Sequence, residues 1–465
     1  MNKNHRWTMF FLFFALISIF SIISLFTAGL AIMNNERIAY GVRIGELPLS
    51  GLTEAAAREK IAGYCQQKLS GPGLLLRHEQ QQWYIRPADI ALQTDIPATA
   101  AAAYAVGRSA NPLTNLWENL TSAFSGHPLA VTAAYDEHKL QQLLARTEQQ
   151  LNRPSRDASC TLLDNGKIKI EPEVTGLQFK SKSFAATLRP ELLALNFSQV
   201  IDLPVEPEAP EITSADLQSV DTVISSYSTR FNRFNFNRSE NIRIGAEKLS
   251  QTLLRPGQLF SFNETVGQRV AAAGYREAPA IIDGETVPDI GGGICQVSST
   301  LYNAMLLAGL EATERAVHFY PSTYVPIGFD ATVADNLLDF KFKNSFSRNI
   351  YIMASAGGGY LTVYLLGNHE DRPADAFSLH STIDKTIPPE TTIKYSPALR
   401  PGSSRLEDSG SNGYIVSAYR IKLHNGQEVD RELLHQDQYS PRNRILLVGG
   451  NEKNGFLSFI KKSVF

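Results

Sequence analysis

The chain has 465 residues, of which 43% are hydrophobic and 19% are charged, and its formal net charge is −2. A chain this close to neutral offers no basic surface for a phosphate backbone, so nucleic acid is excluded as a partner. A chain of this length is too long to fold around a single hydrophobic core, so about three globular domains are predicted.

Residues 7–33 form an almost uninterrupted apolar run. It is longer than the roughly 20 residues that cross a bilayer as a helix. Lys3 and Arg6 precede it and no further basic residue occurs before Arg37, which places the short N-terminus in the cytoplasm and the rest outside. The alternative is a cleaved signal peptide, whose apolar region is typically about 7–15 residues. The sequence favours an uncleaved, single-pass membrane anchor within residues 1–35.

Residues 36–130 predict a first small α+β unit. A helical run begins at Glu54, and Thr53 is placed to cap it. Two short runs around Leu74 and Trp83, separated by polar residues, predict a hairpin.

Residues 131–210 repeat this plan as a second unit. A helix is predicted over 136–151 and another over 181–195. Between them, Asn165-Gly166 predicts a hairpin turn because this dipeptide accepts positive φ angles. A Pro-rich linker, residues 205–212, closes the unit.

The phrases at residues 42–53 and 171–176 resemble those of peptidoglycan-binding domains that often precede VanW domains in envelope proteins. The resemblance implies peptidoglycan, through its glycan or its stem peptide, as a partner. The residues themselves show two small mixed units without a catalytic cluster, so passive spacers are the alternative.

The central module, residues 211–372, contains the most informative segment of the chain. Three glycines, Gly291, Gly292 and Gly293, lead directly into Cys295 at the start of a helical run that Gly309 can end. A helix N-terminus carries partial positive charge and unpaired N–H groups, and it lowers the pKa of a thiol. The sequence therefore predicts a reactive cysteine.

The helical run separates two stripes of side chains. Ile294, Val297 and Leu301 recur at the spacing of a core-facing stripe. Cys295, Ser299 and Tyr302 share a different stripe. The thiol therefore need not be committed to the core, although a buried helix residue against a glycine-lined contact is the alternative.

A nucleophilic thiol requires a base and a group that orients the base. His318, in a strand-like run after Cys295, is the candidate base, and Asp330 or Asp335 would orient it. The order Cys, His, Asp is similar in arrangement to transglutaminase-like and other papain-like thiol enzymes. The alternatives are a hydrogen-bonded structural histidine and aspartates that cap turns.

Candidate ligand-binding residues surround this cluster. Gln296 or neighbouring backbone N–H groups are candidate oxyanion donors. Tyr320 and Tyr324 lie in a segment that forms either an aromatic wall for a sugar ring or a rigid loop. The full set of predicted ligand-binding positions is Gly291, Gly292, Gly293, Gln296, Ser299, Tyr302, Tyr320 and Tyr324.

The segment 291–304, the upstream 256–263 and the downstream 318–326 together resemble the VanW family. That family takes its name from an accessory product of vancomycin-resistance gene clusters. The resemblance implies an α+β domain and a cell-envelope setting, and no particular reaction.

Residues 373–450 predict a β-rich module. Alternation over 414–423 indicates a half-buried antiparallel strand. Gly402, Gly413, Gly426 and the segment 439–449 resemble a G5 module, which implies cell-surface glycans and adhesion. Residues 451–465 are predicted to be a tail.

No cofactor or metal site is predicted. The two remaining cysteines, Cys65 and Cys160, could form a disulfide, but the favoured interpretation is that both are small buried hydrophobic residues. No His/Cys cluster has metal-ligand spacing, and no Gly-Lys-Ser/Thr follows the glycines, which argues against a nucleotide loop.

The sequence thus predicts a multidomain, membrane-anchored α+β protein whose bulk is extracytoplasmic. The favoured function is binding of peptidoglycan or its precursors. The alternative is a thiol-dependent acyltransferase or hydrolase that acts on wall amide bonds through Cys295 and His318.

Overall fold

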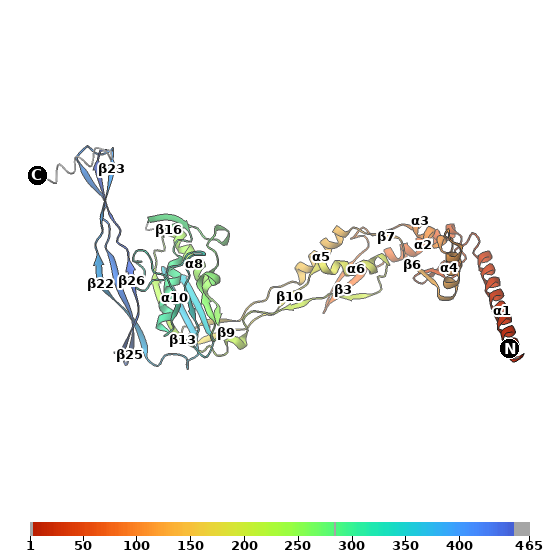
Figure 1. Cartoon of the computed structure of the whole chain (residues 1–465), viewed down its shortest axis with the longest axis horizontal. Helices are drawn as coiled ribbons and strands as arrows, with labels where there is room; N and C mark the ends of the chain where they lie inside the picture. Colours follow the sequence, from red (N-terminus) through yellow and green to blue (C-terminus); the bar gives the residue numbers. More distant parts are fainter. Residues whose placement is uncertain (1–2, 283–284, 451–465) are drawn as a thin grey trace. The chain divides into compact units, whose positions relative to one another are not determined.

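The computed structural model describes residues 3–282 and 285–450. The chain divides into two compact units, the first made of Met1–Ser155 with Thr175–Ala209 and the second of Arg156–Val174 with Pro210–Phe465. Both mix helices and strands, which confirms the multidomain α+β prediction (Figure 1).

The first unit begins with the long helix α1, Lys3–Met33, of which Trp7–Gly29 is long and apolar enough to cross a membrane. Its other helices are α2 Glu54–Leu69, α3 Ile96–Ala105, α4 Pro112–Ser125, α5 Glu137–Leu151 and α6 Ser181–Leu193. Its strands are β1 Val42–Ile44, β2 Leu47–Pro48, β3 Leu74–His78, β4 Gln81–Ile85, β5 Gln93–Thr94, β6 His127–Leu129, β7 Ala133–Ala134, β10 Gly176–Gln178, β11 Val200–Asp202 and β12 Glu206–Glu208.

The two predicted N-terminal repeats share one hydrophobic core. Ile38 and Leu74 from the first predicted repeat lie in the same buried cluster as Leu140 and Leu188 from the second. Strand β11 also pairs in parallel with β3, which joins the sheet across the expected boundary. Neither repeat can therefore bury its apolar face alone. The predicted cap is confirmed, since the Thr53 hydroxyl accepts the Ala56 N–H at the start of α2.

The hairpin closed by Asn165-Gly166 forms, but it belongs to the second unit. Its strands are β8 Ser159–Leu162 and β9 Ile168–Glu171. Cys160 packs there with Leu253, Tyr351 and Leu366. Burial raises the pKa of Cys160 to about 11 and also raises that of Cys65, and both are free, buried thiols as favoured above.

The central part of the second unit is a sheet of order β13-β21-β20-β14 with helices packed on it. The four strands are β13 Thr222–Arg230, β14 Thr252–Leu254, β20 Ile350–Gly357 and β21 Tyr360–Gly367. A smaller sheet has the order β15-β19-β18, with β15 Leu259–Ser261, β18 Ala312–Glu314 and β19 Lys341–Lys343. The hairpin of β16 Glu277–Ile282 and β17 Glu285–Ile290 leads into α10 Ile294–Leu307; the other helical segments are α7 Ser214–Leu217, α8 Phe236–Leu249, α9 Phe262–Val266 and the short 3-10 turn Ala271–Ala273.

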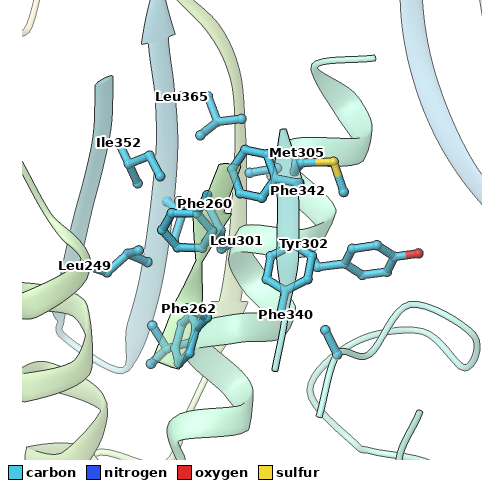
Figure 2. Close-up of a cluster of buried hydrophobic side chains, with 14 of the residues drawn as sticks. Leu249, Phe260, Phe262, Leu301, Tyr302, Met305, Phe340, Phe342, Ile352 and Leu365 are labelled. Carbon is cyan, nitrogen blue, oxygen red and sulfur yellow. The ribbon is translucent and has the colours of Figure 1, made fainter. Parts of the chain in front are cut away.

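Helix α10 lies in the core of this domain. Leu301 and Met305 pack with Phe260, Phe342 and the aliphatic side chains of the sheet, as Figure 2 shows. Every residue from Gln296 to Leu306 is buried. Burial of this much apolar surface fixes the helix, and with it the position of Cys295 at its start.

The C-terminal module contains two three-stranded sheets. The first has the order β22-β25-β26, with β22 Ala376–Ile387, β25 Gly413–His424 and β26 Gln427–Tyr439. The second has the order β23-β27-β24, with β23 Thr391–Ser396, β24 Ser404–Asp408 and β27 Arg444–Gly449. The module contacts α10 directly, because the Arg420 guanidinium on β25 donates to the carbonyl of Leu306 in α10 at 3.4 Å and to that of Leu310 just after the helix at 2.8 Å.

Candidate active site

The glycine triplet is required by close packing around the start of α10. A Cβ atom on Gly292 would lie 2.7 Å from the Ala278 carbonyl oxygen, and Gly293 has a φ of 112°, which favours glycine. A Cβ atom on Gly291 would meet the Arg269 side chain at 2.8 Å. The triplet therefore lets the chain enter the helix while pressed against β16 and the neighbouring arginine.

Cys295 is the second residue of α10 and its side chain is partly exposed. Its thiol donates to the Val333 carbonyl at 3.4 Å. The flanking Ile294 and Gln296 N–H groups bond to the Gly291 and Gly293 carbonyls. In the described part of the chain, the Cys295 N–H has no such backbone acceptor, so it is a donor left over at the helix N-terminus.

His318 and Asp330 form a tight pair beside the thiol. The Asp330 Oδ2 atom lies 2.5 Å from His318 Nδ1 and accepts the His318 N–H at 2.8 Å. Asp330 is only 1% exposed and His318 is 14% exposed. The imidazole interacts with Cys295 closely enough that each group shifts the pKa of the other, and the Tyr324 hydroxyl lies 3.4 Å from Nε2. The structure thus brings Cys295, His318 and Asp330 together, with Asp330 hydrogen-bonded to the imidazole and the imidazole interacting electrostatically with the thiol.

The surroundings favour a thiolate–imidazolium pair. Burial disfavours the thiolate, but the hydrogen bond and positive charge of His318 outweigh it, so the pKa of Cys295 lies below its ordinary value. Burial also opposes protonation of His318, yet the bonds to Asp330 and Cys295 raise its pKa to about 9. The pKa of Asp330 falls to about 2, because the interactions with His318 and Tyr439 exceed the cost of burial.

Two arginines add positive charge beside the thiol. Arg238, on α8, donates to the Gln296 Oε1 atom at 2.8 Å. Arg269 forms an ion pair with Asp335 and also bonds to Asn263. Burial lowers the pKa of both guanidiniums, and the negative charge of a Cys295 thiolate opposes that shift. Both arginines therefore stabilise the ionised sulfur.

The C-terminal module contributes to the far side of Asp330. Tyr439, at the end of β26, donates its hydroxyl to Asp330 Oδ1 at 2.5 Å and accepts the Gly328 N–H at 2.8 Å. Arg315 binds both carboxylate oxygens of Asp437 on β26, at 2.9 and 2.8 Å, and donates to the Asp330 carbonyl at 2.7 Å. Sequence reasoning missed these residues, since nothing local marks Tyr439 as a neighbour of Asp330.

Three predicted site residues have other partners in the structure. Asp335 is bound to Arg269 and lies away from the imidazole, so Asp330 alone orients His318. The Gln296 amide donates to the Thr229 hydroxyl at 3.0 Å and to the Arg230 carbonyl at 2.9 Å, which leaves no free N–H for an oxyanion. Tyr302 is buried, and its hydroxyl lies 2.9 Å from His435 Nε2, directed away from the cluster of Figure 2.

Of the remaining predicted residues, Ser299 forms structural hydrogen bonds and Tyr320 lies at the surface. The Ser299 hydroxyl donates to the Cys295 carbonyl at 2.6 Å and accepts the Ala331 N–H at 2.9 Å, so it ties α10 to the loop that carries Asp330. Tyr320 is partly exposed and meets the exposed Phe319 ring edge to face, at 5.0 Å between centroids. These two rings lie next in sequence to His318.

A cavity of about 570 Å³ lies elsewhere in the second unit, lined by residues 224–226 of β13, by Leu307 at the end of α10, by His369 and by residues 372–377. None of the thiol, imidazole or carboxylate groups described above lines it. A ligand in this cavity would not reach the Cys295 thiol, so the cavity is not part of the candidate site.

Comparisons with known proteins show which family the segment carrying these residues belongs to. The family model described as "VanW like protein" matches residues 237–366, which include Cys295, His318 and Asp330. The uncharacterized protein YoaR of Bacillus subtilis (strain 168) is 35% identical over 239 residues, covering 51% of this chain and 77% of YoaR. The chain is a VanW family protein. The vancomycin B-type resistance protein VanW of Enterococcus faecalis is 27% identical over 134 residues, covering 28% of this chain and 49% of that protein.

Two further family models match this VanW protein. One, described as "Putative peptidoglycan binding domain", matches residues 83–198 and so spans the boundary predicted at residue 130. The other is the G5 domain, at residues 379–451. A solved G5 domain of an IgA1 protease is 25% identical with a TM-score of 0.13, covering 17% of this chain and 96% of that one. The family matches make this a cell-wall-associated protein.

Proposed function

We propose that this VanW protein is anchored in the membrane by α1, holds peptidoglycan outside it, and breaks or exchanges an amide bond of the wall by thiol catalysis. The observation that supports the proposal is the juxtaposition of Cys295, which is partly exposed, with the hydrogen-bonded pair His318 and Asp330. A nucleophile, a base and an orienting carboxylate in that order are the components of nucleophilic acyl transfer.

In the first half of the reaction the Cys295 thiolate attacks the amide carbonyl carbon, and a carbon–sulfur bond forms. The negative charge that develops on the carbonyl oxygen is met by the unpaired Cys295 N–H at the helix N-terminus. The His318 imidazolium then gives its proton to the amide nitrogen, the carbon–nitrogen bond breaks, and the amine leaves. The acyl group remains on the sulfur as a thioester.

In the second half the neutral His318 imidazole removes a proton from water or from a second amine. That nucleophile attacks the thioester carbon, the carbon–sulfur bond breaks, and the thiolate–imidazolium pair is restored. Water gives hydrolysis, and an amine gives transfer. Asp330 stays ionised throughout, because its pKa of about 2 lies far below that of the imidazole.

The wall as substrate is supported by the domains that flank the site. The N-terminal unit matches a peptidoglycan-binding family and the C-terminal module matches G5. Peptidoglycan bound through these two parts would be held by the same chain that carries the thiol. The amide bonds proposed as the substrate are those of its stem peptides.

The test has two arms. Alkylation of the full chain by iodoacetamide at pH 6 should be fast in the wild type and absent from the Cys295→Ala protein, with Cys65→Ala as the matched control that leaves the rate unchanged. Purified cell walls should release or exchange amines with the wild type, and Cys295→Ala and His318→Ala should abolish this. A thiol that reacts no faster than free cysteine would overturn the proposal.

Wall binding is measured separately, by co-sedimentation of the Cys295→Ala protein with purified walls. Retention in the pellet is expected, because the thiol is not part of the proposed glycan contacts. A protein that stays wholly in the supernatant would remove peptidoglycan as the partner while leaving thiol chemistry on another amide.

A further inference from the structure

Helix α4 exposes its apolar face. Leu113, Trp117 and Phe124 are 76%, 69% and 76% exposed, although each is a large hydrophobic side chain. They belong to one stripe at helical spacing, formed by Leu113, Leu116, Trp117, Leu120 and Phe124. A helix on a soluble domain ordinarily turns such a stripe toward the core, so this face requires a partner.

The opposite, polar face of α4 is fastened to the protein. The Glu118 carboxylate accepts the Gly107 N–H at 2.8 Å, and the Asn119 Oδ1 atom accepts from the Asn34 amide at 3.0 Å. Ser122 is buried, and its carbonyl oxygen packs so closely on Gly41 that a Cβ there would lie 1.8 Å away. These contacts prevent α4 from rolling its apolar stripe inward.

The stripe continues from the apolar helix at the chain start. The Phe124 ring stacks on Phe26 of α1, with 5.3 Å between centroids. Phe26 lies near the C-terminal end of Trp7–Gly29, the part of α1 that is long and apolar enough to span a bilayer. The exposed face of α4 is therefore attached to the end of that span, at the level where tryptophan concentrates in membrane proteins.

We propose that α4 is an interfacial helix that lies in the headgroup region of the bilayer crossed by α1, with Leu113, Trp117 and Phe124 inserted toward the acyl chains. The proposal rests on α1 acting as a bilayer span, as in the proposed function, and is independent of the thiol chemistry. Such helices insert their apolar face about 5–10 Å into the boundary between headgroups and acyl chains. Docking would hold the first unit against the membrane surface.

The lipid chemistry follows from the helix sequence. Helix α4 carries one acidic side chain, Glu118, and no lysine or arginine. Attraction to anionic headgroups therefore cannot drive the docking, and burial of apolar side chains must do so. Zwitterionic lipid alone should be sufficient.

The experiment uses the full chain reconstituted in phosphatidylcholine vesicles with lipids brominated at shallow or deep positions. Subtracting the emission of the Trp117→Phe protein from that of the wild type isolates Trp117 from the other two tryptophans of the chain. Trp117 emission should be quenched, more by shallow than by deep bromines, and equally when phosphatidylglycerol replaces part of the lipid.

Two variants test the stripe itself. Leu113→Gln and Phe124→Gln should each weaken the equilibrium for docking of α4 in the membrane by roughly tenfold and reduce the fraction of Trp117 emission that is quenched. Leu337→Gln is the matched control, because Leu337 is 83% exposed on the second unit and should leave quenching unchanged. Unquenched Trp117 with water-like emission would overturn the proposal. So would unquenched emission that depends on protein density, which would make a second copy of the chain the occupant.

The alkylation rate of Cys295, measured in the same vesicles, reports the proposed function separately. Loss of quenching with fast alkylation would refute the interfacial helix alone. Slow alkylation with quenching intact would refute the thiol chemistry alone.

Discussion

The Tyr439 hydroxyl donates a 2.5 Å hydrogen bond to Asp330 Oδ1, while Asp330 Oδ2 holds the His318 imidazole. Tyr439 belongs to β26 of the G5 module and Asp330 to the VanW domain. The carboxylate that holds the His318 imidazole is therefore positioned from both sides of a domain boundary. The G5 module is part of the framework of the site.

Removing this hydroxyl should impair the site without unfolding the domain. In the Tyr439→Phe protein, Asp330 loses a donor to its charged form, and the free energy of unfolding should fall by about 1.5–3 kcal/mol. The pKa of Asp330 should rise, and the rate of thiol alkylation at pH 6 should fall because the imidazole is held less firmly. Denaturant titration and alkylation measure the two effects.

Tyr414→Phe is the control for that change. Tyr414 lies in the same module, on β25, and no hydrogen bond of its hydroxyl occurs among the described residues. The Tyr414→Phe change should alter the free energy of unfolding by no more than about 0.5 kcal/mol and should leave the alkylation rate unchanged. Equal alkylation rates in Tyr439→Phe and Tyr414→Phe would show that Tyr439 does not position the base.

Substitution of the two aspartates predicted to orient His318, Asp330 and Asp335, should have different effects on the alkylation rate of Cys295. Asp330→Asn removes the charge that raises the pKa of His318 to about 9, so the imidazolium and with it the thiolate are lost near neutral pH. Alkylation at pH 6 should fall by at least about tenfold, one decade for each pKa unit. Asp335→Asn should preserve most of the rate, since Asp335 pairs with Arg269. Comparable losses in both variants would contradict the assignment.

The pH profile follows from the direction of the shifts. Activity requires the thiolate and the imidazolium together, so it should rise on an acid limb that lies below the ordinary thiol pKa and fall on an alkaline limb near pH 9. A single plateau through pH 10 would contradict an imidazolium proton donor. Initial rates across pH 4–10 supply the measurement.

The same shift affects stability with a defined sign. The pKa of His318 is raised by folding, so its stabilising contribution is complete below about pH 6.5 and is lost as pH rises through about 9. The contribution is at most about 3 kcal/mol, and it should be absent from His318→Ala. Unfolding free energies that do not converge between wild type and variant above pH 9 would contradict the protonated pair.

Local features of the site could be predicted from the sequence. The glycine triplet, the helix that begins at Ile294 and the stripe that frees Cys295 follow from spacing and backbone preference, which act over a few residues. The candidate base His318 follows from the requirement of a thiol for a proton acceptor. These predictions needed no information about distant segments.

The remaining features depend on contacts far apart in the sequence. Asp330 and Asp335 both follow His318 in one irregular segment, and only the fold decides which faces the ring. Tyr439 and Arg238 reach the site from other elements with no local pattern that marks them. The two predicted N-terminal repeats share one core in the structure. The sequence did not predict this, because helix and strand patterns do not tell whether two apolar faces pack against each other.

The glycine triplet offers the most direct test of how the fold presents the thiol. A Cβ atom in Gly292→Ala would lie 2.7 Å from the Ala278 carbonyl, a backbone atom that cannot swing aside, so the start of α10 must move. We expect a loss of about 1–3 kcal/mol in unfolding free energy and a slower alkylation of Cys295 at pH 6. Gly357→Ala is the control, because a Cβ there meets nothing within 4 Å. An alkylation rate in Gly292→Ala equal to that of the control would mean that the thiol's reactivity does not depend on this helix start.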